Sequence, residues 1–204
     1  MHSTFLKKTT ITTVAIAVLT LGLLSGCGIQ SIPAAKNEVE ANLAEVTNQY
    51  KRRADLIPNL VQTVKGYASH EQETLEAVVN ARAKATSMQI DASNLSPEKL
   101  QEFQAAQGSL SQALGRLMVV AENYPQLKAD QNFRDLQAQL EGTENRITVA
   151  RQRHIEGIKN FNNLVTIFPT SLTAKYILKE EKLPQWTVDE GEKQQNEKAP
   201  SVEF

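Results

Sequence analysis

An apolar repeat with a spacing of seven residues dominates the chain between residues 133 and 168. This spacing is the period at which one helix packs along another in a coiled coil. A second row of mostly apolar side chains fills the intervening positions. The repeat therefore predicts a long helix with one buried face, formed by Phe133, Leu140, Ile147, His154, Phe161 and Phe168 and by Leu136, Thr143, Ala150, Ile158 and Val165.

Two earlier spans carry similar rows, and all three spans are rich in Ala, Leu, Gln, Glu, Lys and Arg, which favour helices. Three such faces can be buried only against one another. The predicted fold is therefore all-α: an elongated antiparallel bundle of three long helices and a short fourth helix. The earlier rows are Val39, Leu43, Val46, Tyr50, Ile57, Val61, Val64, Ala68, Leu75 and Val78, then Leu100, Phe103, Leu110, Leu114, Leu117, Ala121 and Tyr124.

Prolines divide the chain into these helices. Ser96 and Pro97 predict the start of the second helix, with a capping oxygen followed by proline in the first turn. Pro125 and Pro169 end the second and third patterns. The first pattern runs as one span from Pro33 to about residue 88, and we expect a kink at its internal Pro58. Proline has no N–H for the carbonyl four residues earlier, that of Ala54.

The amino terminus has the parts of a bacterial export signal. Lys7 and Lys8 precede an apolar stretch over residues 11–24, and Leu-Ser-Gly stands before Cys27. This order is typical of a lipoprotein, in which the cysteine receives a diacylglyceryl group and a further acyl chain such as palmitate after cleavage. The alternative is an uncleaved transmembrane helix from about residue 9 to 26. Both predict attachment to a membrane.

The predicted domain organisation follows from these features. Residues 1–26 form the signal peptide or membrane anchor, 27–35 a lipidated tether, 36–185 the helical bundle and 186–204 a disordered tail. Cleavage would remove two of the 22 basic residues and none of the 23 acidic ones, leaving a net charge of −3. This charge does not favour nucleic acid as a partner. With one cysteine in the chain, we expect no internal disulfide.

Candidate catalytic chemistry is sparse. His70 and Glu71 begin like a zinc-protease motif, but Thr74 stands where the second histidine belongs. His154 lies on the apolar seam and is expected to be a core residue with a local partner. We therefore expect no metal, no cofactor and no enzymatic activity.

The stretch from Tyr50 to Val61 reads Tyr-Lys-Arg-Arg-Ala-Asp-Leu-Ile-Pro-Asn-Leu-Val, and Tyr124-Pro125 and Thr143-Glu144-Asn145-Arg146-Ile147 follow further on. In these motifs the chain resembles the LemA family over residues 36–185. The resemblance implies a membrane-attached bundle of long helices and brings no established catalytic site. It is weaker in the third helix, where His154-Ile155 and Phe161-Asn162 stand in place of the family's Tyr-Asn pairs.

Two charged clusters are candidates for a partner surface. Arg52, Arg53, Asp55 and Lys65 surround Pro58, while Glu144, Arg146 and Arg151 lie on the third helix. One interpretation is that they form ordinary ion pairs on helix surfaces. The other is that the kinked, charged segment docks another envelope protein, which could read its shape and its charge.

The sequence therefore predicts a membrane-anchored, non-enzymatic scaffold or docking protein of the bacterial cell envelope, with its helical domain outside the cytoplasm. Its partners would be the membrane, through Cys27 or an uncleaved helix, and an unidentified envelope protein. The alternative is a structural or stress-linked envelope protein that associates with itself.

Overall fold

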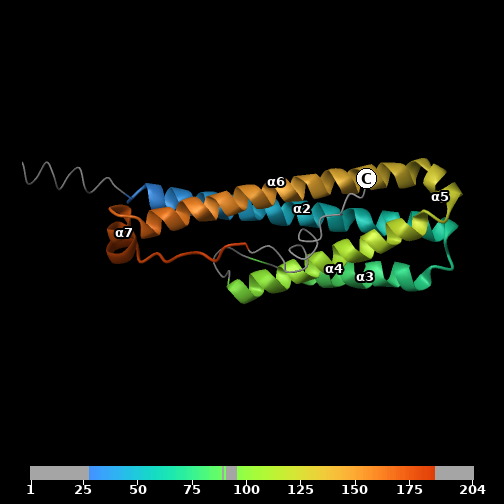
Figure 1. The fold of residues 1–204 in the computed structure, drawn as a ribbon, viewed down its shortest axis with the longest axis horizontal. Helices are drawn as coiled ribbons and strands as arrows, with labels where there is room; N and C mark the ends of the chain where they lie inside the picture. The colour runs from blue at the N-terminus through green and yellow to red at the C-terminus, as the bar shows by residue number, and fades with distance from the viewer. Residues whose placement is uncertain (1–27, 89, 91–95, 187–204) are drawn as a thin grey trace, which may run out of the picture. The chain divides into compact units, whose positions relative to one another are not determined.

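The computed structural model describes residues 28–88, 90 and 96–186, and within these ranges it contains helices and no strand. The predicted all-α bundle is confirmed. The predicted signal segment and the tail from residue 187 onward lie outside the described residues. No described helix is both long enough and apolar enough to cross a bilayer. The elements are α2 (Ser31–Tyr67), α3 (Gln72–Ser87), α4 (Pro97–Ala121), α5 (Pro125–Ala129), α6 (Gln131–Thr166), α7 (Thr170–Thr173) and the π-helix η2 (Ala174–Leu178) (Figure 1).

The chain divides into two compact units, and α2 and α6 contribute to both. The described part of unit 1 comprises residues 28–39 and 157–183. That of unit 2 comprises residues 40–156, apart from the gaps at 89 and 91–95, together with residues 184–186. Each unit has its own apolar core.

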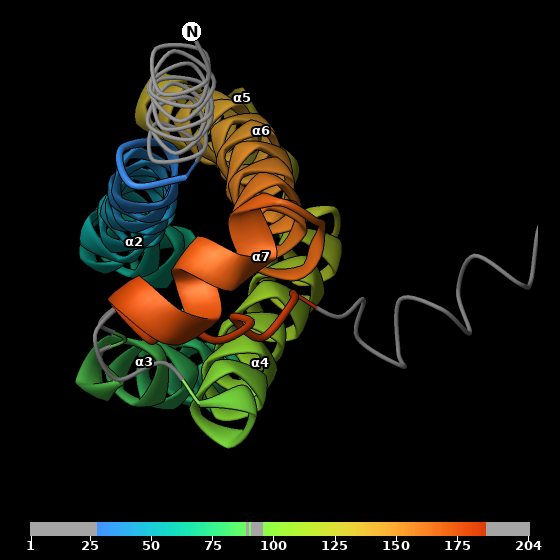
Figure 2. The ribbon, with the colours of Figure 1, turned by 90° about the vertical axis from the view of Figure 1, so that its left-hand side faces the viewer.

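In unit 2, α2 and α6 run antiparallel. Asn42 Nδ2 donates to the carbonyl oxygen of Arg153 at 3.3 Å, and Arg146 Nε donates to Gln49 Oε1 at 3.3 Å, so residue numbers fall along α6 as they rise along α2. Helices α3 and α4 lie side by side in the two views (Figures 1 and 2). The main core of unit 2 draws on all four helices, and its members include Ile57, Leu60, Val64, Leu75, Val78, Leu110, Leu117, Phe133 and Leu140.

The span predicted as one helix up to residue 88 is two helices, because α2 ends at Tyr67 and α3 begins at Gln72. The Arg82 side chain of α3 reaches the backbone of Ala54 in α2, so the second helix folds back along the first. Apolar residues continue at helical spacings through Ala68 to Leu75, and periodicity alone could not reveal this turn. In the turn, the Glu71 N–H donates to the Ala68 carbonyl oxygen at 3.1 Å.

Unit 1 is built around the start of α2 and the end of α6. Its core contains Ile32, Val39, Ile158, Phe161, Val165 and Ala174. Residues 31–35, which were predicted to be part of the tether, belong to α2. After Thr166, the predicted short fourth helix is formed by α7 and η2, which follow one another directly in the chain. Asn162 then holds the returning segment: its amide donates to the Leu183 carbonyl oxygen at 3.0 Å and accepts from the Leu183 N–H at 2.9 Å.

The seven-residue repeat predicts the buried face of α6 correctly as far as Phe161 and Val165. Phe168 is the exception, since 71% of its surface is exposed. The reason is that α6 ends at Thr166, so the helical period no longer sets the direction of the following side chains.

Candidate functional site

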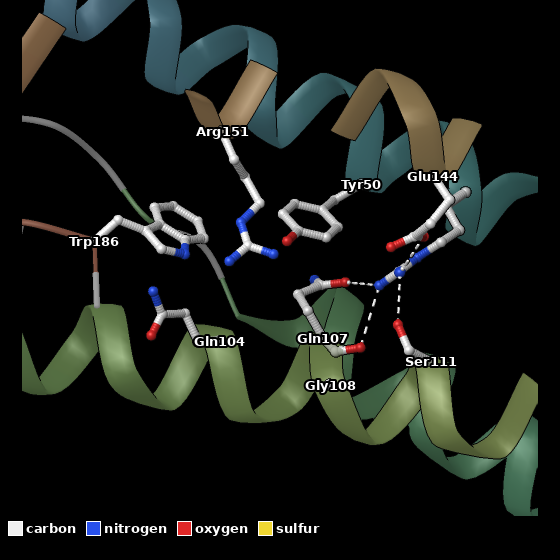
Figure 3. A pocket seen from close by; sticks show the side chains of 9 residues that line it. Tyr50, Gln104, Gln107, Gly108, Ser111, Glu144, Arg151 and Trp186 are labelled. Atoms are coloured by element: carbon white, nitrogen blue, oxygen red, sulfur yellow. Dashed lines mark hydrogen bonds and ion pairs between the residues drawn. The ribbon is translucent and has the colours of Figure 1, made fainter. Parts of the chain in front are cut away.

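A buried arginine, Arg53, organises the polar interior of unit 2. Only 2% of its surface is exposed. Its Nη1 donates to Ser111 Oγ and to Glu144 Oε2, each at 2.9 Å (Figure 3). Its Nη2 donates to the side-chain oxygen of Gln107 at 2.7 Å and to the Gln107 carbonyl oxygen at 3.2 Å. One guanidinium group therefore joins α2, α4 and α6.

Helical spacing brings these groups together. Gln107 and Ser111 are four residues apart on α4 and so lie on one face of that helix. Tyr50 precedes Arg53 by three residues on α2, and the Arg53 guanidinium carbon lies 5.0 Å from the centre of the Tyr50 ring. Gln107 also donates from Nε2 to the carbonyl oxygen of Ala85 near the end of α3, at 3.3 Å. All four long helices of unit 2 thus meet in this network.

The burial of Arg53 corrects its assignment to an exposed partner surface. The two predicted charged clusters meet through the ion pair between Arg53 and Glu144. The Glu144 side chain is 53% exposed, whereas the Arg53 side chain is buried. Such a pair fixes the helices relative to one another within unit 2 and leaves its arginine inaccessible to a partner. The remaining predicted residues fall into an exposed group, Arg52, Asp55, Pro58, Lys65 and Arg146, and the half-buried Arg151.

A cavity of about 60 Å³ lies beside this network. Figure 3 shows the side chains around it, which come from α2, α4 and α6 and from Trp186. The Arg151 guanidinium carbon lies 5.2 Å from the centre of the Trp186 ring. Trp186 also packs edge-on against Phe103 and His154, with ring centres 6.5 Å and 5.9 Å apart. His154 is fully buried, as predicted for a core histidine.

Trp186, which was assigned to the disordered tail, is buried. The sequence offered one signal: it is the only tryptophan of the chain, two positions after Pro184. Gln104 and Gln107 were also missed, because glutamine on a helix rich in Gln carries no distinctive pattern.

Several hydrogen-bond donors line the cavity, together with the Glu144 carboxylate. Within the described protein atoms, neither Trp186 Nε1 nor Gln104 Nε2 has an acceptor, although both are buried. Together with the cationic Arg151, they suit water molecules or a small acceptor group such as a carboxylate, which a cavity of this volume can hold. Ser111 Oγ accepts from Arg53, and the described residues contain no group of three or more His, Cys, Asp or Glu side chains placed to hold a metal ion.

Titratable side chains elsewhere in unit 2 have shifted pKa values. The N–H of Phe133 donates to Asp130 Oδ1 at 2.9 Å, and the Tyr67 hydroxyl donates to Asp130 Oδ2 at 3.0 Å. These bonds favour the carboxylate and lower the pKa of Asp130, the Phe133 N–H contributing most. The hydrogen bond to Asp130 raises the pKa of Tyr67. Similarly, a hydrogen bond to Glu71 raises the pKa of Tyr124.

The fold and the site together define an all-α protein whose long helices pack around a buried arginine, and both terminal nitrogens of this arginine donate hydrogen bonds to neighbouring helices. The chain belongs to the LemA family, whose model matches residues 42–204. A curated relative, Protein LemA of Metamycoplasma hominis, is 23% identical over 137 residues, which make up 67% of this chain and 56% of the relative. The matched region thus spans little more than half of that relative's length.

Proposed function

We propose that this protein is a membrane-anchored, non-enzymatic scaffold or docking protein of the bacterial cell envelope, attached through a lipid on Cys27 or through an uncleaved helix over residues 9–26. The observation that supports it most directly is the position of Gly28, the next residue. Gly28 is buried in unit 1, and α2 begins three residues later at Ser31.

The packing of Gly28 explains why this matters. Its φ of +104° is a conformation that side-chain-bearing residues rarely adopt, and a Cβ at this position would lie 3.3 Å from the Thr173 Cβ and 3.4 Å from the Thr170 Cβ. The residue that directly follows Cys27 is therefore packed within unit 1, which leaves no room for a flexible linker between Cys27 and this unit. Such a junction favours a domain held in a defined position at the membrane surface.

We propose that the docking surface is formed by residues of the two predicted charged clusters that are exposed in the structure. Arg52 and Asp55 are exposed on α2, and Arg146 is exposed on α6. The hydrogen bond from Arg146 to Gln49, three residues before Arg52, links α6 to α2 beside these charges. Exposed charges of this kind contribute little to folding but strongly affect the rate and specificity of association.

The anchor is tested by mass spectrometry of the amino-terminal peptide from membranes and by a Cys27→Ser variant. We expect an acylated Cys27 in the wild type, and in the variant an unacylated precursor held by residues 9–26. An unmodified Cys27 together with an intact residue 1–26 segment would instead support the uncleaved helix. Recovery of the wild-type chain outside the membrane fraction would refute membrane anchoring.

The docking role is tested by crosslinking in intact membranes followed by mass spectrometry. We expect a heteromeric complex that an Arg52→Glu, Arg146→Glu variant loses and that an Arg116→Glu control retains, since Arg116 is exposed on α4 outside both clusters. Crosslinks between copies of this chain alone would favour the self-associating alternative. A complex that survives the double charge reversal would refute this surface.

A further inference from the structure

We infer that residues 167–177 form a membrane-contacting segment whose apolar side chains enter the interfacial layer of the same bilayer that holds the anchor. This inference rests on the proposed anchoring at Cys27 or residues 9–26. It concerns unit 1 alone.

The segment exposes an unusual amount of apolar surface. Among the described residues with exposed large apolar side chains, five fall within these eleven positions: Ile167, Phe168, Leu172, Tyr176 and Ile177. Phe168, Tyr176 and Ile177 are 71%, 69% and 63% exposed. A concentration of this kind in a folded domain marks a surface that meets a protein or a membrane.

The anchor proposed at Cys27 or residues 9–26 favours the membrane as the surface that covers these side chains. Gly28 packs against Thr170 and Thr173 of α7, in the middle of the segment. In the proposed function, residue 27 carries the lipid or ends the spanning helix, and it is covalently joined to Gly28. The exposed apolar side chains therefore belong to the same short segment as the threonines that pack against Gly28. Gly28 in turn directly follows the residue at which the chain would leave the bilayer.

The fold holds the segment in place, so its exposure is not a result of fraying. The Thr170 hydroxyl lies 2.6 Å from the Leu164 carbonyl oxygen and 2.9 Å from the Ile167 carbonyl oxygen, at the end of α6. Thr173 and Ala174 are buried, and Ala174 belongs to the core of unit 1. Their neighbours Leu172, Tyr176 and Ile177 are left exposed.

The chemistry of the segment also suits a lipid interface. Aromatic rings prefer the headgroup level, and lysines near it are attracted to anionic lipids. The Lys175 Nζ lies 5.5 Å from the centre of the Tyr176 ring, and Lys179 is exposed directly after η2. Glu180 lies close by, but its carboxylate is paired with Lys36 Nζ at 2.6 Å.

A photocrosslinking experiment on the full-length chain in its own membrane tests the inference. A benzophenone amino acid replaces Phe168 in one variant and Val119 in a control variant. Val119 is a matched control because it is 68% exposed but lies on α4 in unit 2. Circular dichroism verifies that both variants are folded. We expect several-fold more crosslinking to lipid acyl chains from position 168 than from position 119.

The outcomes separate this inference from the proposed function. If the chain is anchored and position 168 labels lipid no more than position 119, the inference is wrong while the anchoring stands. Labelling of an envelope protein or of a second copy from position 168, in place of lipid, also overturns it. If fractionation and mass spectrometry show no anchor, the proposed function fails first and the inference fails with it.

Discussion

Arg82 donates a hydrogen bond from Nε to the carbonyl oxygen of Ala54, at 2.8 Å. Pro58 stands four residues after Ala54 and has no N–H, so this oxygen lacks its usual partner within α2. The arginine of α3 replaces the missing donor and joins the two helices. The helix continues through Pro58, and the carbonyl oxygen that this proline leaves without a donor is bonded within the chain itself.

The energetic link between Arg82 and Pro58 can be measured by a double-mutant cycle. Arg82→Ala should lower the free energy of unfolding by about 1–3 kcal/mol, because it leaves a partly buried carbonyl oxygen without a donor. The same substitution should cost less in a Pro58→Ala background, where the alanine N–H can bond to Ala54. Equal costs in the two backgrounds, measured by urea denaturation, would contradict this explanation.

Arg53 and Arg52 are adjacent in sequence but should differ sharply in their effect on stability. Arg53→Ala removes the donors to Gln107, Ser111 and Glu144 and should cost at least about 2 kcal/mol in the free energy of unfolding. Arg52→Ala changes an exposed side chain and should stay within about 0.5 kcal/mol of the wild type. Similar denaturation midpoints for the two variants would count against the buried network.

Asp130 should make stability depend on acid pH. Its pKa is lowered in the folded state, so it stabilises the fold above its unfolded pKa, and this contribution is lost as the pH falls through the folded value. We expect Asp130→Ala to reduce the melting temperature at pH 7 and the difference from wild type to shrink in acid. Asp130→Asn, which keeps the capping oxygen without the charge, serves as the control. A difference that does not change between pH 7 and pH 2 would rule out the carboxylate as its source.

Asn162 should hold the returning segment of unit 1 in place. Asn162→Ala leaves the partly buried N–H and carbonyl of Leu183 without these partners and should cost about 1–3 kcal/mol. It should also speed hydrogen exchange at the Leu183 amide. Its exposed neighbour offers a matched control, since Asn163→Ala should leave both quantities nearly unchanged. Unaltered exchange at Leu183 in the Asn162 variant would contradict the assigned role.

The sequence predicted the all-helical fold and most of its core, because burial along a straight helix follows from periodicity alone. Leu140, Ile147 and His154 are buried for this reason. It also predicted the start of α4, where Ser96 Oγ accepts from the Lys99 N–H at 3.2 Å. Capping is a local interaction, so local sequence is sufficient to identify it.

Only the tertiary structure decided which polar side chains are internal. Arg53 and Arg52 are the same residue type at adjacent positions, and only the packing of α4 and α6 against α2 gives the first of them its acceptors. The turn after Tyr67 and the burial of Trp186 likewise depend on contacts between residues far apart in sequence. Local composition encodes propensity and period, whereas the burial of a charge depends on partners that meet only in the folded chain.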